Sequence, residues 1–177
     1  MLQAMNQARP AALWGAAIAG VLESTEHAAA AIDRLERGGF DLSKVSVIGK
    51  EEPSALHAMG LAVAGAQARL WGQRSALWER LAETPAGMAL AWVPLVGYVV
   101  AVGPVAGALV GRRWQARASH ASALDRMLTL CGMSPGEMQT YGSALRGGQL
   151  LLLVHGGSVS TARARQLLKN LDAGAAA

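Results

Sequence analysis

The chain has 177 residues, of which 52% are hydrophobic and 16% are charged. This composition excludes an intrinsically disordered chain and suits one domain with a substantial core. The net charge of +4 comes from basic residues scattered in ones and twos, and only 5% of residues are aromatic, so we expect no nucleic-acid partner. A single cysteine excludes an internal disulfide framework and favours a reducing, cytoplasmic compartment.

The first 50 residues predict a strand, a helix and a second strand. Residues 11–22, which follow Arg9, also resemble the apolar part of a secretory signal, but no small-residue cleavage site follows them. We therefore predict a flexible N-terminus over 1–15 and a strand over 16–22. Ser24 is a suitable N-cap for a helix that ends at Gly38 and Gly39. Residues 45–48 form the second predicted strand, and residues 49–53 are expected to end it.

Residues 54–83 predict one long helix within a helical insertion over 54–92. Its apolar residues alternate three and four apart, close to the seam of a coiled coil. Two interpretations remain open, namely a helix packed on its own domain and an oligomerisation helix. The residues expected to make apolar contacts in this insertion are Leu70, Trp71, Leu77, Trp78 and Trp92.

No charged residue occurs from Thr84 to Gly111. The stretch is long enough to cross a bilayer, but Pro94 and Pro104 divide it, and residues 94–104 favour a strand. Gly103, Gly107 and Gly111 stand at helical spacing and predict a flat groove that another backbone could approach closely. That groove is expected either to pack on the domain's own sheet or to join two molecules.

The C-terminal part predicts a helix ending near Cys131, a helix over 134–146, a strand over 149–155 and a final helix from Ser160 to Leu171, with a disordered tail over 172–177. Serine, proline and glutamate at 134, 135 and 137 are typical of a capped helix start. This element order predicts a single domain over 16–171 of the α+β class. The expected architecture is a ferredoxin-like βαβ…βαβ sandwich with a long helical insertion after the second strand and an extra C-terminal helix.

Several segments along the chain together carry a resemblance to a known family. They are Ala17–Ser24, Ala28–Ile32, Leu35, Gly39–Leu42, Val45–Lys50, the Pro94, Gly97 and Gly103–Pro104 pattern, and Gly132–Val154. In this order they resemble bacterial heat-induced general stress proteins, a family with a domain of unknown function. The resemblance runs over roughly residues 16–171 and departs from the family at 67–83, where charged residues stand in place of an apolar helix. It implies a stress-related, membrane-associated or scaffold-like role without a known chemistry.

The sequence contains no catalytic, metal or cofactor signature. Its four histidines have no metal-ligand spacing, Cys131 has no cysteine partner, and no phosphate-binding loop of the GxxxxGK[ST] type is present. We therefore expect no enzyme activity and no cofactor. The leading hypothesis is a homo-oligomeric scaffold whose open sheet faces and long helix pair between subunits. One alternative is a membrane-associated protein that inserts residues 88–111. Another is a carrier of an apolar lipid or quinone, or an accessory subunit of a partner enzyme. The pocket of such a carrier would be lined by Trp71, Trp78, Trp92, Leu95 and Tyr98.

Overall fold

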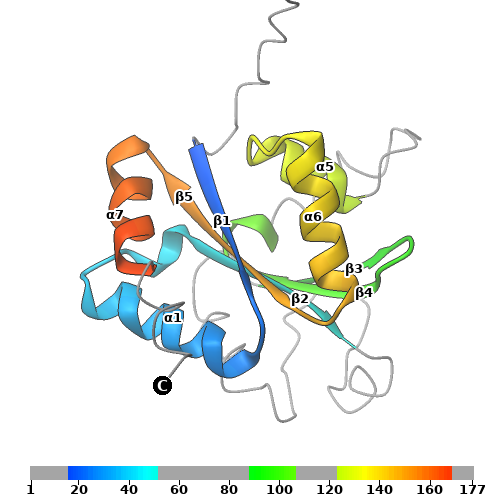
Figure 1. The fold of residues 1–177 in the computed structure, drawn as a ribbon, viewed down its shortest axis with the longest axis horizontal. Coiled ribbons are helices and arrows are strands. Elements are labelled where there is room, and N and C mark those ends of the chain that lie inside the picture. The colour runs from blue at the N-terminus through cyan, green and yellow to red at the C-terminus, as the bar shows by residue number, and fades with distance from the viewer. Residues whose placement is uncertain (1–15, 52–87, 107–122, 169–177) are drawn as a thin grey trace, which may run out of the picture.

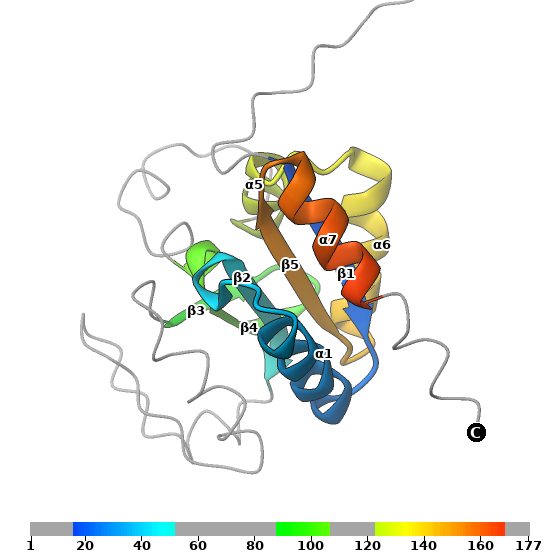
Figure 2. The ribbon, with the colours of Figure 1, turned by 90° about the vertical axis from the view of Figure 1, so that its left-hand side faces the viewer.

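Three layers, with one antiparallel sheet between two pairs of helices, make up the computed structural model of the chain (Figures 1 and 2). The structure describes residues 16–51, 88–106 and 123–168. The strands are β1 (Ala16–Leu22), β2 (Val45–Glu51), β3 (Met88–Val93), β4 (Gly97–Val102) and β5 (Leu150–Gly156), and the helices are α1 (Thr25–Arg37), the short 3-10 helix η1 (Leu42–Lys44), α5 (Ala123–Leu130), α6 (Pro135–Arg146) and α7 (Ser158–Leu168).

The strand order is β1-β5-β2-β4-β3, and every neighbouring pair is antiparallel. The last strand of the chain therefore lies between the first two. The α+β class predicted from the sequence is confirmed, but this order and the helices on both faces do not confirm a ferredoxin-like sandwich, in which helices cover one face of the sheet. In the described residues α1 and α7 cover one face of the sheet, and α5 and α6 cover the other.

Alternating side chains of the strands supply two separate cores. The first lies under α1 and α7 and includes Ile32, Leu35, Val47 and Leu152, while the second lies under α5 and α6. Strand β5 is apolar from Leu150 to Val154 because both of its faces are covered. The second core includes Ile48, Val99, Ala101, Met127, Leu128, Cys131, Leu145, Leu151 and Leu153.

Local sequence signals determine where the helices begin and end. The Ser24 side chain accepts a hydrogen bond from the His27 amide, and Gly39 follows the helix with φ of +68°. Helix α6 begins with the predicted capping box, in which the Glu137 carboxylate accepts from the Ser134 amide and Ser134 Oγ accepts from the Glu137 amide. These predicted helix boundaries are confirmed.

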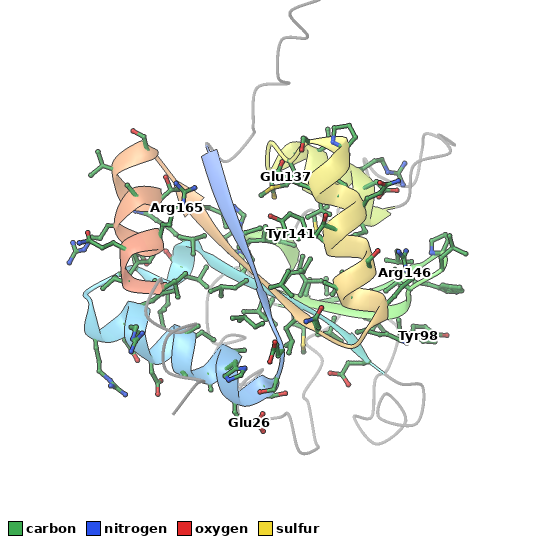
Figure 3. All side chains as sticks on the ribbon, viewed as in Figure 1. Glu26, Tyr98, Glu137, Tyr141, Arg146 and Arg165 are labelled. Carbon is green, nitrogen blue, oxygen red and sulfur yellow. The ribbon has the colours of Figure 1, made fainter. Side chains whose placement is uncertain are left out.

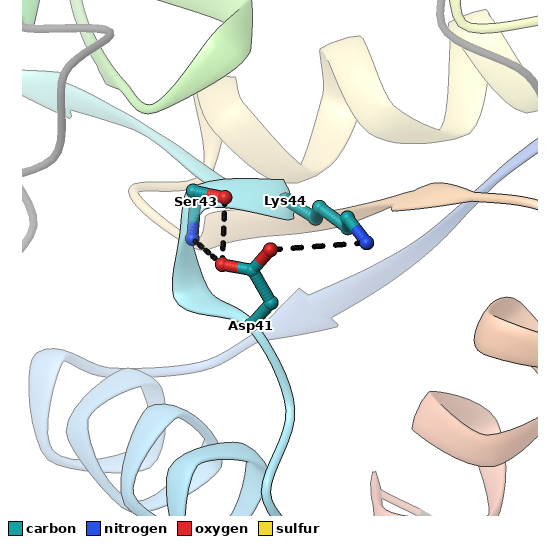
Figure 4. Close-up of polar contacts among 3 residues, drawn as sticks. All are labelled: Asp41, Ser43 and Lys44. Atoms are coloured by element: carbon teal, nitrogen blue, oxygen red, sulfur yellow. Dashed lines mark hydrogen bonds and ion pairs between the residues drawn. The ribbon is translucent and has the colours of Figure 1, made fainter.

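A short turn capped by Asp41 leads into β2 (Figure 4). The Asp41 carboxylate accepts hydrogen bonds from the Ser43 amide at 3.0 Å and the Ser43 hydroxyl at 2.6 Å, and it lies 3.7 Å from Lys44 Nζ. The hydrogen bonds from Ser43 lower the pKa of Asp41, with a smaller contribution from Lys44. Val45 follows directly as the first residue of β2.

Three predicted boundaries are wrong around the sheet. Strand β2 continues through residues 49–51, where a break was predicted, because these residues pair with β4. Residues 88–92, assigned to the helical insertion, belong to β3. Residues 94–104, predicted as a single strand, contain the turn at Pro94 and then β4. The rest of the predicted insertion and the predicted N- and C-terminal segments 1–15 and 172–177 lie outside the described residues.

Candidate functional site

The β3–β4 hairpin, residues 88–102, carries three exposed large apolar side chains at the end of the sheet. Trp92 is 56% exposed, Leu95 86% and Tyr98 39%. Trp92 and Tyr98 stand directly opposite each other in the antiparallel register, and their ring centroids lie 6.3 Å apart. Figure 3 shows Tyr98 at this end of the sheet. The two aromatic residues therefore present one continuous apolar surface next to Leu95.

The turn of the hairpin holds Leu95 in an unfavourable backbone conformation. Pro94 precedes it, the Val96 amide donates to the Val93 carbonyl at 3.1 Å, and Leu95 has φ of +67°. These features are typical of a type II turn, whose third position usually holds glycine because a side chain is disfavoured there. Among the described residues Leu95 is the only non-glycine residue with positive φ. A bulky apolar residue thus occupies a strained and exposed position.

A second notable group, the Ser46–His155 junction, lies inside the sheet. Ser46 Oγ is 2.9 Å from His155 Nε2 and accepts a hydrogen bond of 3.1 Å from the Val105 amide. Both side chains are buried. Burial lowers the pKa of His155 from its ordinary 6.5 to about 4, so the imidazole is neutral at pH 7.

The Ser46–His155 junction has a structural use. The backbone becomes helical at Pro104, directly after Gly103, which has no side chain to cap a helix. Ser46 on β2 caps this helix start in its place. A serine and a histidine at this distance could act as nucleophile and base in an open site, but Ser46 is 0% exposed. The geometry therefore favours a role in holding the helix start against β2 and β5.

Replacing Ser46 should reveal this role. We expect Ser46→Ala to lower the free energy of unfolding by about 1–3 kcal/mol, because the buried Val105 amide and His155 Nε2 both lose this oxygen. Urea unfolding of the two proteins measures the difference. Ser158→Ala is the matched control, since Ser158 is exposed and its loss should cost roughly 0.5 kcal/mol or less. Equal losses for the two variants would contradict the assigned role.

Gly103 and Trp92 are the two predicted contact residues that lie within the described ranges. Gly103 is buried before the helix start with φ of +84°, and a Cβ atom there would lie 2.1 Å from the Val45 carbonyl oxygen. It therefore faces β2 of the same chain. It lies just before the helix start, although the predicted glycine ladder placed it on a helix. Trp92 lies on the hairpin described above. Gly107, Gly111, Leu70, Trp71, Leu77 and Trp78 lie outside the described residues.

Nothing in the described ranges adds a metal or membrane-spanning feature. No group of three His, Cys, Asp or Glu side chains there could hold a metal ion. Over the same ranges, none of the helices is both long enough and apolar enough to cross a bilayer. The described part of the 88–111 segment, which one hypothesis placed in a membrane, forms β3, β4 and the start of a helix.

Comparison with models of known protein families finds no match, and comparisons with curated proteins and with solved structures find none either. The residues themselves must therefore support any functional hypothesis. Sequence reasoning named Trp92, Leu95 and Tyr98 together only as lining residues of an apolar pocket in the carrier alternative. It placed Trp92 in the helical insertion and the other two in a strand. Pro94 was the available signal for a turn, because proline is favoured at the second position of a β-turn.

Proposed function

We propose that this chain is a non-enzymatic interaction protein that self-associates through the β3–β4 hairpin. One observation supports this most strongly: Trp92, Leu95 and Tyr98 are exposed together on a hairpin without a charged residue. Tryptophan and tyrosine are enriched at the centres of protein interfaces, where they bury a large area at a small cost in side-chain entropy. We also propose a stress-related, scaffold-like role for this protein. That part of the proposal rests on the resemblance of its sequence to bacterial general stress proteins.

The strained turn supports the same use of the hairpin. Leu95 contributes little to the fold, since 86% of its surface is exposed, yet its positive φ costs free energy. Glycine would form the same turn without that cost. A leucine at this position is therefore better explained by a contact outside the monomer than by the stability of the monomer.

Leu95→Gly should change stability and assembly in opposite directions. We expect the free energy of unfolding to rise by on the order of 1 kcal/mol, because the turn is relieved of strain. We expect the dissociation constant of the oligomer to rise at least about tenfold, because an apolar contact is lost. Denaturant unfolding measures the first effect, and light scattering after size-exclusion chromatography over a range of concentrations measures the second.

Val159→Ala is the matched control for assembly. Val159 is 82% exposed, almost as much as Leu95, but lies on α7 away from the hairpin. Its replacement should leave the oligomer unchanged. A wild-type chain that stays monomeric at all concentrations would contradict self-association. If that monomer also bound lipid vesicles and Leu95→Gly abolished the binding, the hairpin would instead be a membrane-surface contact.

A further inference from the structure

The outer edge of β3 is the feature from which a specific mode of self-association follows. Within the described ranges, β3 pairs with β4 on one side and is an edge of the sheet on the other. An edge strand presents backbone N–H and C=O groups to any other strand. Natural edges often carry lysine or another charged residue, or a proline, which prevents such pairing, but Met88–Val93 contains none of these.

The charge of the chain favours a second copy as the partner for this edge. Two molecules with a net charge of +4 repel each other. From Thr84 to Gly111, however, the chain has no charged residue, so two copies can meet along β3 without placing like charges opposite each other. A strongly charged peptide would find no opposite charge on this strand. The uncharged strand of a second copy is thus electrostatically matched to it.

The side chains of β3 match a second β3 in size as well. Met88 and Leu90 belong to the partly buried margin of the core under α1 and α7, and Trp92 follows them at the same alternation. Residues directly opposite each other in two antiparallel strands share a face of the sheet. A twofold axis between two copies of β3 must therefore pass beside one residue, which then faces its own counterpart in the other copy. Centred on Leu90, the pairing sets Met88 against Trp92 of the other copy, and sulfur–aromatic contacts are favourable.

We propose that two copies pair antiparallel along β3 about a twofold axis at Leu90, which joins two five-stranded sheets into one continuous sheet. This inference rests on the proposed self-association and names its geometry. It extends the core under α1 and α7 across the axis, because the partly buried Leu90 of one copy packs on Leu90 of the other, and the partly buried Met88 of each copy packs on Trp92 of the other. The exposed Trp92 becomes covered by the same contact.

Disulfide trapping tests the pairing in the full-length chain. On the axis, the two copies of residue 90 have Cα atoms about 4.5–5.5 Å apart, a distance that a disulfide can bridge. We expect the Leu90→Cys variant to form a covalent dimer when oxidised, seen as a doubled mass that reductant reverses. The native Cys131 does not compete, because it is buried and burial raises the pKa of its thiol to about 12.

Two control variants separate this geometry from other contacts. Val21→Cys probes the opposite edge of the sheet on β1, and Leu95→Cys probes the tip of the hairpin. Efficient trapping of Leu90→Cys without trapping of Val21→Cys supports the proposal. Trapping of Leu95→Cys without Leu90→Cys contradicts strand pairing but agrees with self-association through the hairpin. A wild-type monomer in light scattering contradicts both.

A second variant protects the test from a folding defect. If circular dichroism shows that Leu90→Cys is unfolded, the double variant Met88→Cys with Trp92→Cys replaces it, because the same axis sets these two positions opposite each other. We expect this variant to give a dimer with two disulfides. Monomeric, folded double variant after oxidation, in a chain whose wild type is a dimer, overturns the proposed axis.

Discussion

Gly103→Ala should lower the free energy of unfolding by at least about 3 kcal/mol. Gly103 has φ of +84°, where a side chain costs roughly 1–2 kcal/mol. The added Cβ atom would also lie 2.1 Å from the Val45 carbonyl oxygen and 2.9 Å from Ser46 Cα. Both neighbours are backbone atoms of β2, so this clash can be relieved only by movement of a central strand. That movement should cost about as much free energy as the unfavourable backbone conformation. Urea unfolding monitored by circular dichroism measures the loss.

Gly148→Ala separates the two causes. Gly148 has almost the same backbone conformation, with φ of +82°, but no atom lies within 4 Å of the position its Cβ would take. We expect this variant to lose only the conformational part, about 1 kcal/mol. Similar losses at the two glycines would show that β2 yields to the added atom and that the close approach at Gly103 is unimportant.

Acidification should destabilise the fold through His155. The pKa of this buried imidazole is about 4 in the folded chain against an ordinary 6.5, so between these values the unfolded chain binds a proton that the folded chain does not. The contribution of neutral His155 to the free energy of unfolding is therefore fully present above pH 6.5 and is lost as the pH falls toward 4. Each pH unit in this window is worth about 1.4 kcal/mol, and the loss between pH 6.5 and pH 5 is roughly 2 kcal/mol.

His155→Gln isolates this contribution from that of other titrating groups. Glutamine keeps a polar side chain near Ser46 but does not titrate, so the variant should be less stable than wild type at pH 7 and should lose less on acidification. The difference between the two free energies of unfolding, measured from pH 7 to pH 5, should shrink by roughly 2 kcal/mol. A constant difference would mean that His155 has the same pKa in the folded and the unfolded chain.

Elements with a strong local signal were predictable from the sequence. The run of residues 16–22, the serine that caps α1 and the serine–glutamate pair that begins α6 each act within a few residues. The order of the strands could not be predicted from such local signals. It depends on pairings such as Ala16 with Gly156, which no periodic pattern encodes, and the sequence therefore suggested a ferredoxin-like arrangement that the structure does not confirm.

The hairpin shows why the candidate site was only partly predictable. Met88, Ala89 and Leu90 are good helix formers, so local propensity favoured an extension of the helical insertion. Their position at the edge of the sheet comes from pairing with β4, and tertiary pairing outweighs such small preferences. Similarly, Ser46 and His155 are 109 residues apart, and neither has a sequence neighbour that signals the contact.

The position of β5 has a consequence for how the chain folds during its synthesis. Strands β1 and β2 leave the ribosome early, but each pairs with β5, which lies between them and is completed only at Gly156. Until then the first two strands lack their shared neighbour, and the apolar faces of β2 and α1 have no complete core to bury them. The N-terminal third should thus remain unprotected against proteases or aggregation until nearly the whole domain has been translated.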